Sequence, residues 1–203
     1  MKIRKYCKID REFVVIDGAL YPFPKEEGTH FLTALYRALS VDYPKFHKMD
    51  TLSKLGFLAS ELIFREEDEN ILMFDNMAII CFNRSSSLEY DTKFQDSIEA
   101  QNYYPSPSVF VYTLPNIVTG EIAIRNKLYG ETSFYITPHF DAVQMVRTVE
   151  NAFQDRDTQS VLAAWIEAYE ETQEVLMMWV EQGKDGGMPF LAENINTLYN
   201  KSF

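Results

Sequence analysis

The sequence predicts an α/β fold in which a layered mixed β-sheet is flanked by helices. Continuous apolar runs, as expected of buried strands, alternate with stretches whose apolar residues recur at helical spacing. Two closely spaced apolar runs, 161–166 and 175–180, predict a pair of neighbouring strands late in the chain. No internal repeat, low-complexity tract or Pro- or Gly-rich linker divides the sequence. This order of elements indicates one α/β domain over residues 1–203.

The first third of the chain is expected to supply strands and then two helices. Residues 1–27 contain short β-like runs that end at turn residues and a Pro-marked loop. Apolar residues then recur at helical spacing over residues 31–39 and 51–64, which predicts a helix in each range. The charged run 65–70 predicts a solvated loop.

The middle of the chain predicts a buried strand followed by helices. Residues 77–82 form a continuous apolar run, typical of a strand that is covered on both faces. A polar stretch leads to an expected helix near residues 90–100. A second apolar run, 109–112, precedes a helical stretch that is expected to extend from residue 116 to Tyr129 and to end at Gly130.

The segment 133–153 reads as strand, sharp turn and helix. The β-like run 133–136 stops at the turn 137–141, and the next helix carries an apolar stripe over residues 142–153. A last helix is expected around residues 191–199. A strand that turns sharply into a helix is an architecture that presents a nucleophile at a helix N-terminus. This segment is therefore the first candidate for a functional site.

The order of residues around this segment resembles the β-ketoacyl synthases of the thiolase-like superfamily. Leu114-Pro115-Asn116 opens a helix, Gly130 follows, and Thr137 stands in the turn after the next strand. In that family the turn reads Thr-Ala-Cys, and the Cys takes up the acyl chain. The resemblance places His139 at the position of the Cys.

Two more stretches are similar to the family, namely Lys48-Met49-Asp50 and the strand 77–82 with the polar residues after it. The resemblance covers roughly residues 10–170, which corresponds to the N-terminal half of such a synthase. It implies a thiolase-like half fold, a site built from His139 with Asn116, Thr137 and Phe140 around the substrate, and no cofactor.

Each of these residues also has a purely structural interpretation. Asn116 and Thr137 are residue types that cap helices, since their side chains accept hydrogen bonds from free backbone N–H groups. Pro138 suits the first position of a helix, and Asp141 in a first turn complements the helix dipole. Their order along the chain, rather than any single residue, favours the resemblance.

The chemistry of a condensing enzyme is incomplete in this sequence. A His at a helix N-terminus is expected to stay neutral, and an acylated imidazole is labile, so His139 is a poor substitute for a thiolate. The basic groups that the resemblance assigns to the C-terminal half are missing, and only His30 and His47 remain besides His139. Pairing of His139 with Asp141 and Ser133 would make a hydrolytic site, but residues two apart do not share a helix face. No metal-ligand or phosphate-loop motif is present.

Composition and charge exclude several classes of function. The net charge of −11 argues against nucleic acid or an anionic membrane surface as partner. An acidic acyl carrier protein would need a local basic patch, for which Lys2, Arg4, Lys5 and Lys8 are the candidates, although a solvated strand edge explains them as well. No run of about 18 apolar residues is long enough to span a membrane, and no signal-peptide-like stretch begins the chain.

The two cysteines suggest neither a disulfide framework nor a metal site, which fits a reduced cytoplasmic protein. Cys81 lies in an apolar run and is expected to be buried, whereas Cys7 is a candidate for an exposed thiol that nothing nearby would activate.

Three functional hypotheses follow. The preferred hypothesis is a non-catalytic relative of the β-ketoacyl synthases that forms a homodimer, or a heterodimer with a complete synthase, through Thr132–Ile136. Such a subunit would serve fatty-acid or polyketide-type chain synthesis and would also meet an acyl carrier protein. The alternative is an active acyltransferase or thioesterase that acts on carrier-protein or coenzyme A thioesters and uses His139 as general base. The third is a binding or assembly domain that merely shares the fold.

Overall fold

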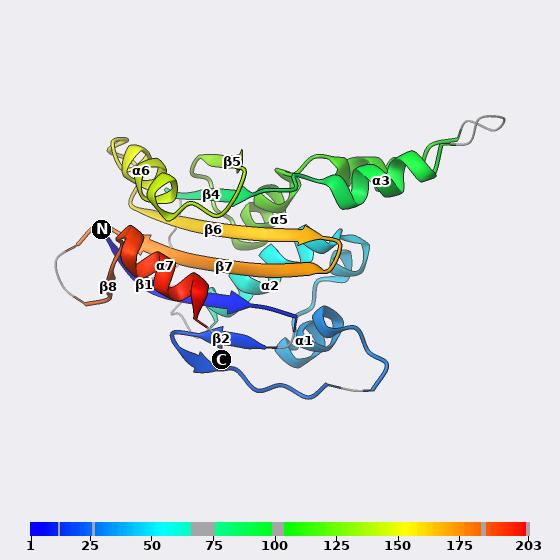
Figure 1. The fold of residues 1–203 in the computed structure, drawn as a ribbon, viewed down its shortest axis with the longest axis horizontal. Helices are drawn as coiled ribbons and strands as arrows, with labels where there is room; N and C mark the ends of the chain where they lie inside the picture. Colours follow the sequence, from blue (N-terminus) through cyan, green and yellow to red (C-terminus); the bar gives the residue numbers. More distant parts are fainter. Residues whose placement is uncertain (12, 26, 66–75, 99–103, 184–185, 202–203) are drawn as a thin grey trace.

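The computed structural model shows one mixed β-sheet as the middle layer, with helices on both of its faces (Figure 1). The structure describes residues 1–11, 13–25, 27–65, 76–98, 104–183 and 186–201. The strands are β1 (Lys2–Ile9), β2 (Val14–Ile16), β3 (Ala19–Leu20), β4 (Met77–Asn83), β5 (Thr132–Ile136), β6 (Ser160–Tyr169), β7 (Thr172–Glu181) and β8 (Met188–Pro189). The α-helices are α1 (Phe31–Leu39), α2 (Thr51–Phe64), α3 (Leu88–Asp96), α4 (Pro107–Phe110), α5 (Ile117–Asn126), α6 (Ala142–Ala152) and α7 (Ala192–Asn200), and two short 3₁₀ helices are η1 (Pro44–Lys48) and η2 (Val111–Thr113).

The strands lie in the order β3-β2-β1-β7-β6-β4-β5, and β8 pairs with β1 beside this path. Strand β4 is parallel to both β5 and β6, whereas β7 is antiparallel to β6 and to β1. The carboxyl ends of β4, β5 and β6 therefore meet at one end of the sheet. In open α/β sheets this end is the usual location of functional sites.

Two cores form because the side chains of the central strands alternate between the faces of the sheet. On β6, Leu162, Ala164 and Ile166 belong to the core under α1, α2 and α5. The intervening Val161, Ala163 and Trp165 belong to the core under α6 and α7. All three layers are therefore tied together through the same strands.

Much of the predicted order of elements is confirmed. Helix α2 has the predicted bounds, and it begins there because the Asp50 carboxylate accepts a hydrogen bond from the Ser53 backbone N–H at 3.1 Å. Strand β4 is buried along its whole length, and β6 and β7 form the predicted pair. Cys81 is buried as expected.

The N-terminal strand differs from its prediction. Strand β1 lies inside the sheet between β2 and β7, so the expectation that its basic residues mark a solvated edge is wrong. Lys8 is 7% exposed, and its ammonium donates hydrogen bonds to the backbone carbonyls of Leu198, Tyr199 and Lys201 at the end of α7. Cys7, on the same strand, is buried rather than exposed, and burial raises the pKa of its thiol.

Local differences also appear in the middle of the chain. The apolar run 109–112 lies in α4 and η2, where Pro107 starts the short helix and the Ser106 hydroxyl caps it. Helix α3 spans Leu88–Asp96 rather than 90–100, and α5 ends at Asn126 rather than Tyr129. Gly130 has a packing role, because a Cβ there would lie 2.2 Å from the Met77 carbonyl oxygen. The loop expected at 65–70 lies outside the described residues beyond Arg65.

Candidate functional site

The turn 137–141 lies at the carboxyl end of β5, beside the end of β4. The Thr137 backbone N–H donates to the Asn83 carbonyl at 2.8 Å, and this bond continues the ladder between the two strands. The Thr137 hydroxyl donates to the carbonyl oxygen of His139 at 3.0 Å, which holds the turn in a fixed shape. Thr137 is buried, whereas Pro138 and His139 are exposed. The turn therefore presents His139 on the surface next to the last strand of the sheet.

The position of His139 relative to the helix differs from the expectation. Asp141 is the N-cap of α6, and its carboxylate accepts hydrogen bonds from the backbone N–H groups of Val143 and Gln144 at 2.9 and 3.0 Å. His139 thus lies two residues before the N-cap, and the helix begins at neither Thr137 nor Pro138. The expected effect of the helix dipole on the imidazole lacks a structural basis, because the Asp141 carboxylate already occupies the N-terminus.

Phe140 belongs to an aromatic and carboxylate cluster that connects the turn to α7. Its ring stacks on the ring of Tyr199 with a centroid separation of 3.8 Å and meets Trp165 edge-on at 5.6 Å. Tyr199 and Trp165 both donate to the same Glu174 oxygen, at 2.8 and 3.0 Å. Burial, followed by the charge of Glu174, raises the pKa of the Tyr199 hydroxyl, so this group remains a hydrogen-bond donor.

Glu167 adds a second carboxylate on the same face of the sheet. It lies opposite Glu174 in the β6–β7 register and is 2% exposed. One of its oxygens accepts the Arg84 backbone N–H at 2.9 Å, and the other has no partner among the described residues. The sequence analysis missed this cluster, because its members lie far apart in the chain and only the fold brings them together.

The other predicted site residues do not converge on His139. Asn116 occupies the N-cap position of α5 and is exposed, and its side chain makes no capping hydrogen bond. The Ser133 hydroxyl donates to Glu131 at 3.1 Å, and the Asp141 carboxylate caps α6. Among the described residues, no hydrogen bond joins His139 to Ser133 or Asp141, so the hydrolytic arrangement is not assembled. The polar turn after β4, which contains Ser85, Ser86 and Ser87, is closed by Asn83, whose side-chain amide exchanges two hydrogen bonds with the backbone of Ser86.

Strand β5 is the last strand of the sheet and leaves one backbone edge open. The Ile79 N–H donates to the Glu131 carbonyl and the Thr137 N–H donates to the Asn83 carbonyl, both at 2.8 Å. Because backbone groups alternate along a strand, the odd-numbered residues face β4. The N–H and C=O groups of Thr132, Phe134 and Ile136 therefore point outward. Within the described residues β5 pairs with β4 alone, so this edge is available for another strand.

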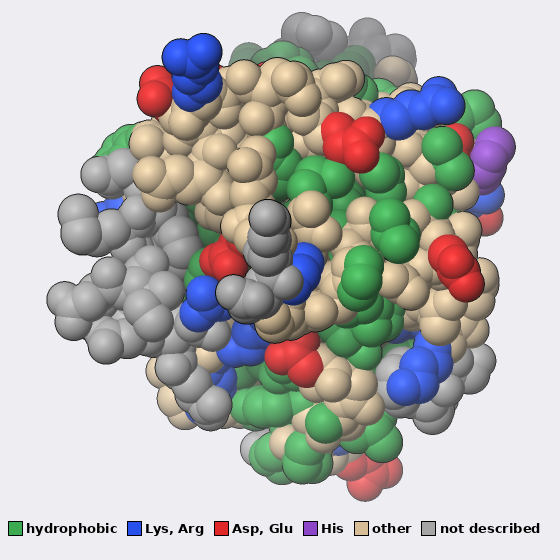
Figure 2. Space-filling model, turned by 90° about the vertical axis from the view of Figure 1, so that its left-hand side faces the viewer, with side chains coloured by type: hydrophobic (Ala, Val, Ile, Leu, Met, Phe, Trp, Pro, Cys, Tyr) green, Lys and Arg blue, Asp and Glu red, His purple; other side chains and the backbone are tan. Residues whose placement is uncertain are grey.

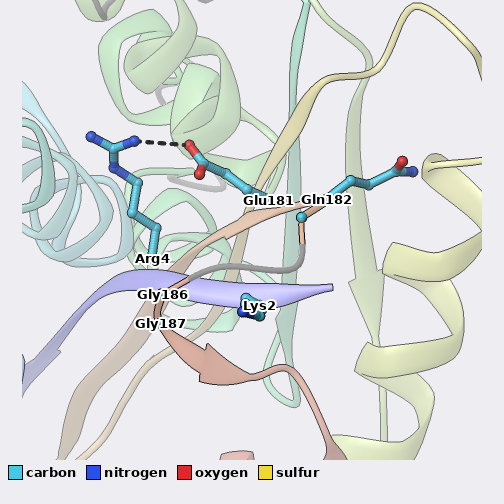
Figure 3. A pocket seen from close by; sticks show the side chains of 7 residues that line it. Lys2, Arg4, Glu181, Gln182, Gly186 and Gly187 are labelled. Carbon is cyan, nitrogen blue, oxygen red and sulfur yellow. Dashed lines mark hydrogen bonds and ion pairs between the residues drawn. The ribbon is translucent and has the colours of Figure 1, made fainter.

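A polar hollow lies at the opposite end of the parallel strands. Lys2, Arg4, Glu181 and the glycines 183, 186 and 187 line it, and the Arg4 guanidinium and Glu181 carboxylate point toward each other at 3.3 Å (Figure 3). Basic and acidic side chains intermingle over this end of the molecule (Figure 2). The described lining of this hollow therefore carries charges of both signs.

The described part of the chain contains no group of three or more His, Cys, Asp or Glu side chains that could hold a metal ion. None of its helices is both long and apolar enough to cross a membrane.

Solved structures with a similar fold are ketosynthases and their complexes. The ketosynthase ApeO in complex with its chain length factor ApeC, from Xenorhabdus doucetiae, matches with a TM-score of 0.59 and 14% identity over 90% of this chain and 80% of that one. The ishigamide ketosynthase/chain length factor matches with a TM-score of 0.65 and 16% identity over 93% and 63% of the two chains. AntDE:AntF, a type II polyketide acyl-carrier protein in complex with its ketosynthase, matches with a TM-score of 0.58 and 12% identity over 89% and 62%.

The comparisons define the class of fold. No protein-family model matches the sequence, and no curated protein matches it either. The structural matches show that this chain has the layered α/β fold of thiolase-like ketosynthases, which confirms the fold class predicted from the sequence. The chain spans less than two thirds of the length of two of the three chains named above.

Proposed function

We propose that this protein is a non-catalytic, ketosynthase-like partner subunit that pairs through β5 with a complete ketosynthase. The process it serves is polyketide- or fatty-acid-type acyl chain synthesis. The open edge of β5, at the carboxyl end of which the His139 turn lies, carries the proposal. The fold adds support, because two of the matched structures are described as pairs of a ketosynthase and a chain length factor.

The burial of both cysteines supports the proposal that this chain does not transfer acyl groups. Acyl uptake by a cysteine requires a thiolate that is accessible to the substrate. The only two cysteines, Cys7 and Cys81, are both fully buried, and burial raises the pKa of Cys81 to about 12. In the described part of the chain, no hydrogen bond joins the His139 side chain to a hydroxyl or a carboxylate, because the Thr137 hydroxyl donates to the His139 backbone carbonyl and the Asp141 carboxylate caps α6. A ketosynthase-like fold without an accessible thiol fits a partner subunit better than an acyl-transferring one.

The chemistry of β5 suits strand addition. Its outward-facing backbone groups offer a ladder of donors and acceptors, and backbone bonds of this kind supply affinity in strand-addition complexes. Tyr135 stacks on Phe82, with ring centroids 5.2 Å apart, and this contact holds the strand flat against β4. Ile136 is 58% exposed, so a partner strand would also bury apolar surface.

An acyl carrier protein is a further partner in this proposal, because one of the matched structures is a carrier protein in complex with its ketosynthase. The basic patch expected on β1 does not support direct docking of a carrier protein to this chain. The Lys8 ammonium donates its hydrogen bonds to backbone carbonyls at the end of α7, and Arg4 forms an ion pair with Glu181. We therefore assign carrier-protein docking to the assembled pair rather than to this subunit alone.

The test is co-purification of the tagged chain with the Cys-containing ketosynthase of the same organism after co-expression. The chain is expected to recover the ketosynthase in near-equal amount. The variant Ile136→Lys should lose it, because a charged side chain beside the new ladder would be desolvated without a partner. Leu20→Lys is the matched control, since Leu20 is 59% exposed and lies on β3, at the other end of the sheet.

Recovery of the chain without a ketosynthase would overturn the proposal. So would turnover of a carrier-protein or coenzyme A thioester that His139→Ala abolishes, because the alternative of an active acyltransferase or thioesterase predicts that result. An equal loss of ketosynthase from Ile136→Lys and Leu20→Lys would show that β5 is not the interface.

A further inference from the structure

The open edge of β5 is too small to hold a partner by itself. A stable protein–protein interface takes about 20–30 residues from each side. Strand β5 has five residues, and only three of them direct backbone groups outward. A stable pair therefore requires further surface next to β5.

The helices between β4 and α5 expose several large hydrophobic side chains. Residues 88–96 and 107–114, here called the arm, contain α3, α4 and η2, and α3 projects beyond the sheet (Figure 1). No residue of α3 is buried. The large hydrophobic side chains that the arm exposes are Leu88 (43%), Phe110 (54%), Val111 (45%) and Leu114 (52%).

Hydrogen bonds place the base of the arm at the end of β4 where β5 also ends. The Ser87 hydroxyl donates to the Thr113 carbonyl at 2.6 Å, and this bond joins the start of α3 to the end of η2. Asn83, four residues before Ser87, accepts the Thr137 N–H at the carboxyl end of β5. The base of the arm and the exposed Ile136 therefore lie at the same end of β4 and β5.

Internal contacts give the arm a defined shape. Phe94 and Phe110 pack with ring centroids 5.3 Å apart, and Tyr90 meets Tyr112 edge-on at 5.7 Å. These aromatic pairs hold α3 against α4 and η2. The side chains left exposed are consequently fixed in position before a partner arrives, which lowers the entropy lost on binding.

We propose that the arm is the second part of the surface that holds the ketosynthase, so that the partner contacts β5 and the arm together. This inference rests on the function proposed above. The occupant is a ketosynthase rather than a second copy of this chain, because two copies would each bring a net charge of −11. The arm adds to this repulsion, since Lys93 pairs with Glu89 and leaves Asp91 and Asp96 on the same helix.

The test compares two double variants by titration calorimetry against the purified ketosynthase. In the first, Val111→Ser and Leu114→Ser remove apolar surface from the arm while Phe110, which packs on Phe94, is kept. In the second, Leu20→Ser and Leu191→Ser remove surface of similar exposure (59% and 53%) elsewhere. Circular dichroism and thermal unfolding verify that both variants keep the fold.

The arm variant is expected to bind at least tenfold more weakly than the wild type, whereas the control variant binds within about twofold. Equal affinity of the two variants would overturn the role of the arm while leaving the partner function intact. Absence of binding by the wild-type chain would overturn the proposed function, and the role of the arm with it. A concentration-dependent homodimer that only the arm variant disrupts would replace the ketosynthase with a second copy as occupant.

Discussion

Asp50 is predicted to lower the stability of the protein at neutral pH, although it caps a helix. Its side chain is 4% exposed, and desolvation, together with a smaller contribution from Glu89, raises its pKa from 3.8 to about 6. In the unfolded chain the same carboxyl titrates near 3.9. Because each pKa unit corresponds to about 1.4 kcal/mol, holding Asp50 as a carboxylate costs the fold about 3 kcal/mol at neutral pH.

The sign of the pH dependence follows from proton binding. Between about pH 4 and pH 6 the folded protein holds a proton on Asp50 that the unfolded chain has lost. This contribution to stability therefore decreases as the pH rises through this range and is fully lost above the folded pKa. From pH 5.5 to pH 8 the wild type is expected to lose about 1 kcal/mol through this residue alone.

Asp50→Asn isolates the effect, since Asn caps helices about as well as Asp but carries no charge. Urea unfolding at pH 5.5 and pH 8 should show the variant to be more stable than the wild type, by a margin that grows by about 1 kcal/mol over this interval. Asp141→Asn is the matched control, because Asp141 caps α6 from a partly exposed position. A margin that is constant or that shrinks with pH would refute the reasoning.

Two further predictions concern packing and the C-terminal helix. Gly56→Ala on α2 should cost about 1–3 kcal/mol in urea unfolding, because its new Cβ would lie 2.3 Å from Val118 on α5, whereas Gly120→Ala, with no atom within 4 Å, should stabilise by about 0.5–1 kcal/mol. Equal effects at the two glycines would contradict the packing of α2 on α5. Lys8→Met should leave three carbonyls at the end of α7 without their donor and cost about 1–3 kcal/mol. Hydrogen exchange should then accelerate in α7, and unchanged exchange would show that Lys8 does not hold this helix.

The sequence predicted those parts of the fold that depend on local pattern. Helix α2 was found with its bounds, because its apolar spacing and its N-cap are both encoded within a few residues. Strands β4, β6 and β7 were found because continuous apolar runs indicate burial on both faces. The secondary structure of the run 109–112 could not be read from its pattern, since four apolar residues suit a strand or a helix. In the structure Pro107 stands in the first turn of a short helix that includes the start of this run.

The parts that could not be predicted depend on contacts between distant residues. The sequence does not show that β1 is flanked by β2 and β7, so the burial of Cys7 and Lys8 was missed. The cluster that holds Phe140 joins β6, β7 and α7, and only the fold brings its members together. The position of the His139 turn was anticipated, but the helix start was not, because Thr137 and Asp141 are both residue types that cap helices and only Asp141 does so here.

The central claim, that β5 is the edge joined by a partner strand, is tested most directly by residue-resolved amide hydrogen exchange with and without the ketosynthase. In the free chain the amides of Phe134 and Ile136 should exchange rapidly, while those of Ser133 and Tyr135, which face β4, should be protected. Addition of the ketosynthase should protect Phe134 and Ile136 and leave the other two unchanged. Rapid exchange of Phe134 and Ile136 in the saturated complex would contradict the account.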